Sequence, residues 1–242
     1  MKNMHSFIAA LCWCALSVPA AAEPGTAFTS RPYNTVSEAR IVAESILKTG
    51  APLGLRFDRL EPRQKGGFYI LRGQSSGPIE VMEYNAFNRY GSRQEATAAV
   101  RVLASAFKSA GLPVLASSAL KEDGKYSITI YYACQSNPDD LKKFSHHTLT
   151  LQSCERGTTK HLKTLGIPVI ETGKTGEGFK ITLLSKGAPL LASGKRSFAT
   201  LAQAAAAMKT RREELAAGNA LVLFSNTAAT PDGYNYGIAY IE

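Results

Sequence analysis

The chain has 242 residues, of which 45% are hydrophobic and 19% are charged, and its formal net charge at neutral pH is +9. This composition is typical of a folded, water-soluble protein, and it excludes a disordered chain, a collagen and a protein with many membrane spans. At this length the chain can form one large domain or two domains of ordinary size.

The first 22 residues have the layout of a secretory signal peptide. Lys2 is followed by an apolar run over residues 7–18, and residues 20–22 are all alanine, as a cleavage site requires. The apolar run is shorter than the roughly 20 residues that a spanning helix needs. We therefore expect cleavage at this point and a periplasmic or secreted mature protein without a transmembrane segment. A lipid anchor on Cys12 or Cys14 is a weaker alternative, because neither follows a small residue.

Cleavage would leave two cysteines, Cys134 and Cys154, in an oxidising compartment. We predict a disulfide bond between them, which closes a loop of about 20 residues and contributes about 3 kcal/mol in the chain-entropy model. Two separate buried thiols are the alternative. Two thiols without a second close pair lack the spacing of a zinc site, so we expect no bound metal.

Helical patterns occur four times along the chain, and each ends at a glycine that leads into a strand. The four glycines are Gly50, Gly111, Gly166 and Gly218. A glycine at this place supplies the left-handed cap that stops a helix. The second helix shows the pattern most clearly, because Ser92 and Glu95 form a capping box before an apolar face.

Each helix is followed by a strand, a glycine-containing turn and a second strand, and a further strand precedes most of the helices. We therefore predict an α+β protein of four tandem strand-helix-strand-strand units. Pairs of units would share a sheet and form two layers of helix on antiparallel sheet. The predicted domains are residues 23–138 and 139–242, each with two units, and the disulfide would join them. A closed ring of the four units is the alternative.

The strand over residues 126–132 has alternating character. Ile128, Ile130 and Tyr132 share one face, which we expect to pack in the core. Tyr131 lies on the other face, which we expect to be exposed to solvent. An exposed tyrosine on a sheet is suited to contact with a sugar or a protein.

One resemblance to a known family rests on sequence stretches within residues 79–132. These stretches are residues 81–89 followed by Ser92 and Glu95, then residues 110–114, and then residues 124–130. In them the segment resembles the SPOR domains of bacterial envelope proteins, which bind peptidoglycan strands. The resemblance implies a peptidoglycan-like partner.

Reactive side chains form no recognisable catalytic motif. His146 and His147 are adjacent and would point to opposite faces of a strand. His161 could share a helix face with Cys154, but seven residues separate the two side chains by about 10 Å. We therefore predict no catalytic residue and no cofactor, and the sequence assigns no ligand-binding residue.

The positive charge favours an anionic partner. The basic residues are spread along the chain without an RNA-binding aromatic motif, and export argues against nucleic acid. We expect an exported, non-catalytic binding or scaffold protein of a bacterial envelope, with an envelope protein or a peptidoglycan-like polymer as its partner. A periplasmic hydrolase that acts on envelope material, with residues converging from distant units, is the alternative.

Overall fold

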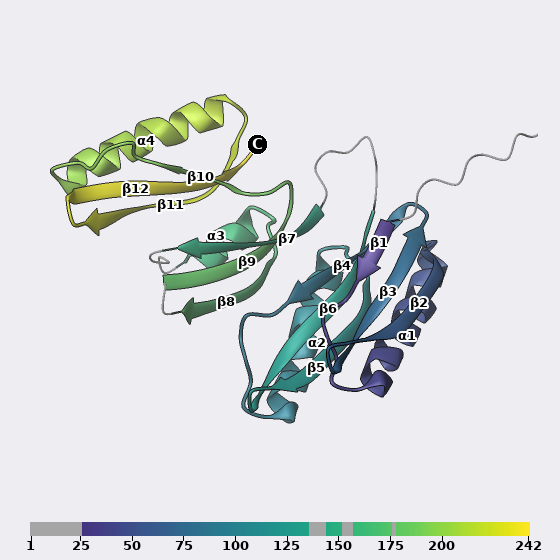
Figure 1. Cartoon of the computed structure of the whole chain (residues 1–242). Coiled ribbons are helices and arrows are strands. Elements are labelled where there is room, and N and C mark those ends of the chain that lie inside the picture. Colours follow the sequence, from purple (N-terminus) through teal and green to yellow (C-terminus); the bar gives the residue numbers. More distant parts are fainter. Residues whose placement is uncertain (1–25, 136–143, 152–156, 176–177) are drawn as a thin grey trace, which may run out of the picture.

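The computed structural model describes residues 26–135, 144–151, 157–175 and 178–242 (Figure 1). It confirms the predicted α+β fold, with helices packed on antiparallel sheets. Unit 1 comprises β1 (Thr26–Thr29), α1 (Val36–Gly50), β2 (Arg56–Lys65) and β3 (Phe68–Ser76), with a short 3₁₀ turn (Ala51–Leu53) after α1. Unit 2 comprises β4 (Ile79–Asn85), α2 (Arg93–Ser109), β5 (Val114–Glu122) and β6 (Lys125–Gln135).

The same order recurs in the second half of the chain. Unit 3 comprises β7 (Phe144–Leu151), α3 (Thr158–Thr164), β8 (Val169–Thr175) and β9 (Gly178–Lys186). Unit 4 comprises β10 (Leu190–Ser193), α4 (Leu201–Ala217), β11 (Leu221–Thr230) and β12 (Gly233–Ile241). The helix α3 is much shorter than the other three.

The helix ends follow local sequence signals, with two differences from the prediction. Gly111 and Gly166 adopt the expected left-handed conformation. Gly50 instead stays helical and the 3₁₀ turn follows it, so the left-handed residue is Gly54. After α4 the left-handed residue is Asn219, a residue type that tolerates this conformation. The predicted capping box of Ser92 and Glu95 is confirmed at the start of α2.

Each unit forms its own three-stranded antiparallel sheet, with its last strand in the centre. The strand orders are β1-β3-β2 in sheet A, β4-β6-β5 in sheet B, β7-β9-β8 in sheet C and β10-β12-β11 in sheet D. The expectation that pairs of units share a sheet was therefore wrong. The units associate through sheet faces instead of sheet edges, because the face of sheet B turned toward unit 1 is largely apolar and becomes buried there.

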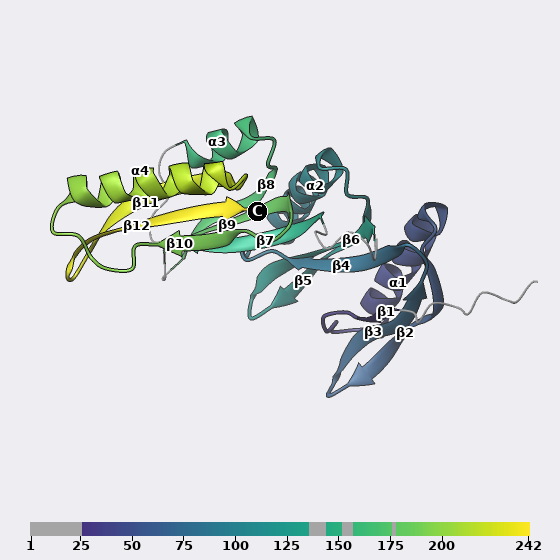
Figure 2. The same ribbon diagram turned by 90° about the horizontal axis from the view of Figure 1, so that it is seen from above.

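The units form a staggered row in which each of the first three helices packs on its own sheet and on the next one. Helix α1 contacts β2 and β3 but also β5, α2 contacts β5, β6 and β8, and α3 contacts β8 and β11. Units 1 and 4 lie at opposite ends of this row, so the arrangement is open and is not a closed ring (Figures 1 and 2). We call the face of a sheet that carries its own helix the inner face, and the opposite face the outer face.

The outer face of sheet B explains why the expectation for Tyr131 was wrong. This tyrosine is fully buried. Its ring lies 6.0 Å from the Phe28 ring, and its hydroxyl lies 2.6 Å from the Tyr33 hydroxyl, both in unit 1. Alternation along a strand reveals two faces, but it does not reveal that a neighbouring unit covers the second one.

The predicted boundary between two domains falls within residues 136–143, outside the described residues. Contacts cross from unit 2 to unit 3, since α2 packs on β8 and β6 contacts β7. The division into two domains stays a prediction. The predicted disulfide does so too, because Cys134 is buried on β6 but Cys154 lies outside the described residues.

Candidate functional site

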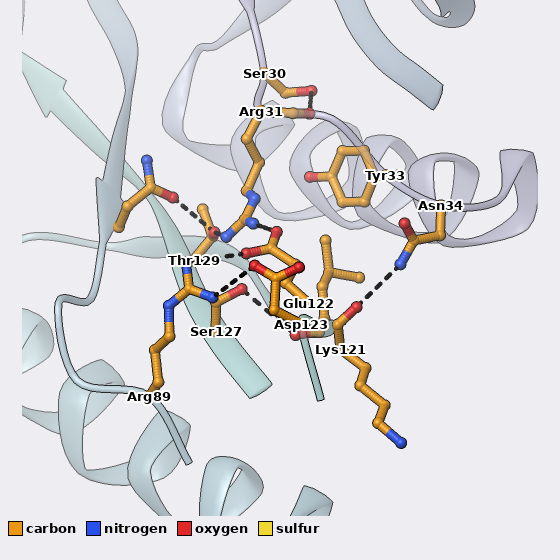
Figure 3. Close-up of polar contacts among 12 residues, drawn as sticks. Ser30, Arg31, Tyr33, Asn34, Arg89, Lys121, Glu122, Asp123, Ser127 and Thr129 are labelled. Carbon is orange, nitrogen blue, oxygen red and sulfur yellow. Dashed lines mark hydrogen bonds and ion pairs between the residues drawn. The ribbon is translucent and has the colours of Figure 1, made fainter. Parts of the chain in front are cut away.

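The joint between units 1 and 2 is built around Arg31, which precedes α1. Its backbone N–H donates to Glu83 Oε2 at 3.0 Å, and its guanidinium donates to Thr129 Oγ1 at 2.9 Å. The guanidinium also forms an ion pair with Glu122, a residue that Arg89 approaches to 3.7 Å (Figure 3). The Arg31 side chain is 13% exposed, so acceptors from β5 and β6 hold a largely buried charge, and the acceptor from β4 holds the backbone of the same residue.

Two tyrosines extend this joint into the core. Burial raises the pKa of Tyr33 to about 12, and burial also raises the pKa of Tyr131. Both phenols therefore stay neutral and share a hydrogen bond. Neither phenol can act as a base near neutral pH. Their contacts across the joint give them a structural role, which is to hold the two units together.

The joint between units 2 and 3 is built around Glu171 on β8, which is 6% exposed. Its carboxylate accepts hydrogen bonds from the backbone N–H of Phe87 at 3.1 Å and of Asn88 at 2.9 Å, and from the Tyr84 hydroxyl. The loop after β4 thus lies on the outer face of sheet C. Close approach here requires Gly173, because an added Cβ would lie 2.9 Å from the Phe87 ring.

The two joints share one hydrogen-bonding arrangement. Arg31 and Asn88 each lie four residues before the residue that caps the following helix, Thr35 and Ser92 respectively. In each joint this backbone N–H donates to a carboxylate of the next unit. Sequence patterns do not reveal Glu171 or Arg31 as site residues, because the carboxylate and its donors lie more than 80 residues apart in the chain at one joint and 52 at the other.

The histidines considered as reactive groups lie in two places, the adjacent His146 and His147 on β7 and His161 on α3. His146 contacts unit 2, where its Nδ1 lies 2.8 Å from the Tyr132 hydroxyl and its ring packs on Tyr84. Burial, and then the neighbouring His147, lower the pKa of His146 to about 4. His161 is exposed on α3, and its proposed partner Cys154 lies outside the described residues.

The shifted pKa of His146 predicts how stability depends on pH. An unfolded histidine binds a proton near pH 6.5 and the folded one near pH 4, so in this interval the unfolded state binds more protons. Stability should therefore decrease as the pH falls from about 6.5 to about 4, by on the order of 2 kcal/mol for a half-buried group. We expect urea titrations across this range to show a weaker decrease in His146→Gln and the wild-type decrease in His161→Gln. An unchanged slope in His146→Gln would contradict the assignment.

The outer face of sheet A differs from the outer faces of the other sheets, because no unit precedes it in the described part of the chain. It forms a hollow of about 760 Å³. Charged side chains dominate the lining, and they are Asp58, Arg59, Glu61, Arg63, Lys65 and Arg72. All four basic residues are exposed. This surface, which we call the basic face, is the candidate binding site.

A carboxylate already lies among the arginines of the basic face. Glu61 Oε1 is 2.7 Å from Arg59 Nε, and Glu61 Oε2 is 4.0 Å from Arg63 Nη2. The hydrogen bond from Arg59 holds the pKa of Glu61 below its usual value. A carboxylate can therefore approach these guanidinium groups on the exposed face.

The described residues contain no group of three or more His, Cys, Asp or Glu side chains placed to hold a metal ion. Among them there is also no helix long and apolar enough to cross a membrane. The fold and the basic face together describe an α+β repeat protein with a charged terminal sheet. Comparisons with protein-family models, curated proteins and solved structures find no match to the chain. The resemblance of residues 79–132 to SPOR domains therefore stays a prediction.

Proposed function

We propose that this chain is an exported, non-catalytic binding or scaffold protein of a bacterial envelope, whose partner is an envelope protein or a cell-wall polymer. The basic face is the observation that carries the proposal. It is a solvent-open hollow with four exposed cations, held on a row of units whose joints are fixed by buried polar contacts. Such a surface attracts an anionic partner and loses little conformational freedom on binding.

The side chains that could support a hydrolase have structural partners instead. Glu171 accepts three hydrogen bonds within a joint, and His146 is held between Tyr132 and Tyr84. A general base must be able to reach a substrate, and these groups lie between packed units. This favours the binding role over the hydrolase alternative.

Co-sedimentation tests the proposed role. The protein starting at residue 23 would be incubated with purified peptidoglycan, and in parallel an affinity column of the protein would be exposed to envelope extract. We expect retention in at least one experiment, and we expect it to weaken as salt is raised because exposed charges are screened. Retention in neither experiment would remove the binding role.

A further inference from the structure

The outer face of sheet A lacks the side chains that hold the preceding unit on sheet B. In sheet B, Arg31 of the preceding unit is held by Glu83, Glu122 and Thr129. The strand registers, aligned at the bulge that both sheets share, place Ala27, Lys65 and Arg72 at the corresponding positions of sheet A. Two carboxylates and a hydroxyl are thus replaced by a methyl group and two cations.

This replacement disfavours docking of a unit that carries arginine at the position of Arg31, such as unit 4 of a second copy. Phe198 bridges to Tyr234 as Tyr33 bridges to Tyr69, which makes Arg196 the counterpart of Arg31 in unit 4. Head-to-tail docking would bring Arg196 against Lys65 and Arg72, and like charges would repel. Unit 4 of a second copy is therefore a poor partner for sheet A, and the charges of the basic face suit an acidic partner instead.

The spacing of the cations indicates the shape of that partner. Arg59, Arg63 and Lys65 point to the same side of β2, and Arg72 on β3 lies opposite Glu61, between the two arginines. Alternate residues of a strand are about 7 Å apart, so the three cations of β2 follow one line at multiples of this distance, and Arg72 lies beside that line on the adjacent strand, about 5 Å away. An extended peptide with acidic residues at alternate positions carries carboxylates at the same spacing.

The peptide would lie across the face and would not extend the sheet. β2 is an edge strand, but it contains Pro62, which has no N–H group, and a bulge between Phe57 and Arg59. Both features interrupt the regular hydrogen bonding that an added strand needs. Side chains therefore provide the contact, because a guanidinium group can bind a carboxylate through two parallel hydrogen bonds.

We propose that the basic face binds an extended acidic segment of a partner protein, with Arg63, Lys65 and Arg72 as its main contacts. This inference rests on the binding role proposed above, and it adds the location of the site and the chemistry of the partner. Glu61 would be displaced toward Arg59, so that Arg63 and Arg72 become available to the incoming carboxylates.

The test is a fluorescence anisotropy titration of the protein with a labelled ten-residue peptide that has glutamate at alternate positions and threonine between. We expect saturable binding that weakens with salt. The double variant Arg63→Glu/Arg72→Glu should bind at least about tenfold more weakly, because two attractions become repulsions. The matched control Lys209→Glu/Arg212→Glu changes the net charge equally at exposed positions of α4 and should bind within about twofold of wild type. Circular dichroism verifies that both variants fold.

The outcomes separate this inference from the proposed function. Equal weakening in both double variants would overturn the inference, because it would indicate attraction by net charge alone. Failure to bind the peptide, together with sedimentation on peptidoglycan, would also overturn it and would leave the proposed function standing. If the protein binds neither the peptide nor peptidoglycan and retains nothing from the extract, both the inference and the proposed function are wrong.

Discussion

Replacing Glu171 by alanine should lower the free energy of unfolding by about 3 kcal/mol. The substitution leaves three donors without their acceptor, namely the buried Tyr84 hydroxyl and the half-buried N–H groups of Phe87 and Asn88. A donor that loses its charged acceptor in a packed joint can find a new hydrogen-bond partner only if water enters. Water can enter here only if the contact between units 2 and 3 loosens.

Urea unfolding followed by circular dichroism measures the loss. Glu213→Ala is the matched control, since Glu213 is an exposed glutamate of α4, and its effect should stay within about 0.5 kcal/mol. An equally small effect of Glu171→Ala would contradict the account of this joint. Hydrogen exchange should locate the loosening at the loop after β4, as the joint requires.

Replacing Tyr131 by alanine should cost about 3–5 kcal/mol of stability, the range found when large buried aromatic side chains are truncated. The side chain is fully buried between units 1 and 2, where it contacts Phe28 and hydrogen-bonds to Tyr33. The substitution removes this packing and leaves the Tyr33 hydroxyl without its partner.

The control for Tyr131 is Phe68→Ala, because Phe68 is an aromatic residue of a strand that is 49% exposed. Its truncation should change the free energy of unfolding by at most about 1 kcal/mol. If Tyr131→Ala is as mild as Phe68→Ala in thermal or urea unfolding, unit 1 does not cover sheet B in solution.

The repeating unit could be predicted from sequence because its signals are local. The capping box of Ser92 and Glu95 and the left-handed glycines Gly111 and Gly166 each act within a few residues of the structure they determine. Local signals could not predict whether two units share one sheet. That depends on which apolar faces pack together, and these faces are formed by residues far apart in the chain.

The basic face and the joint at Glu171 also differ in whether a local sequence pattern predicts them. The basic face has a signal in the sequence, since Arg59, Arg63 and Lys65 share the two-residue period of a strand face. Glu171 had no such signal. Its donors belong to another unit, and nothing near it in sequence distinguishes it from a surface glutamate.

The central claim is that units 1, 2 and 3 each pack on the outer face of the next sheet, whereas no unit in the described part of the chain packs on the outer face of sheet A. Single cysteines at the equivalent positions Gln74→Cys in sheet A and Thr182→Cys in sheet C test this directly. Both would be placed in the protein starting at residue 23 with Cys134 and Cys154 replaced by alanine. A soluble thiol reagent should label position 74 at the rate of an unfolded chain and position 182 at least about a hundredfold more slowly. Equally fast labelling at both positions would contradict the stacked arrangement and remove the reason for regarding the basic face as distinct.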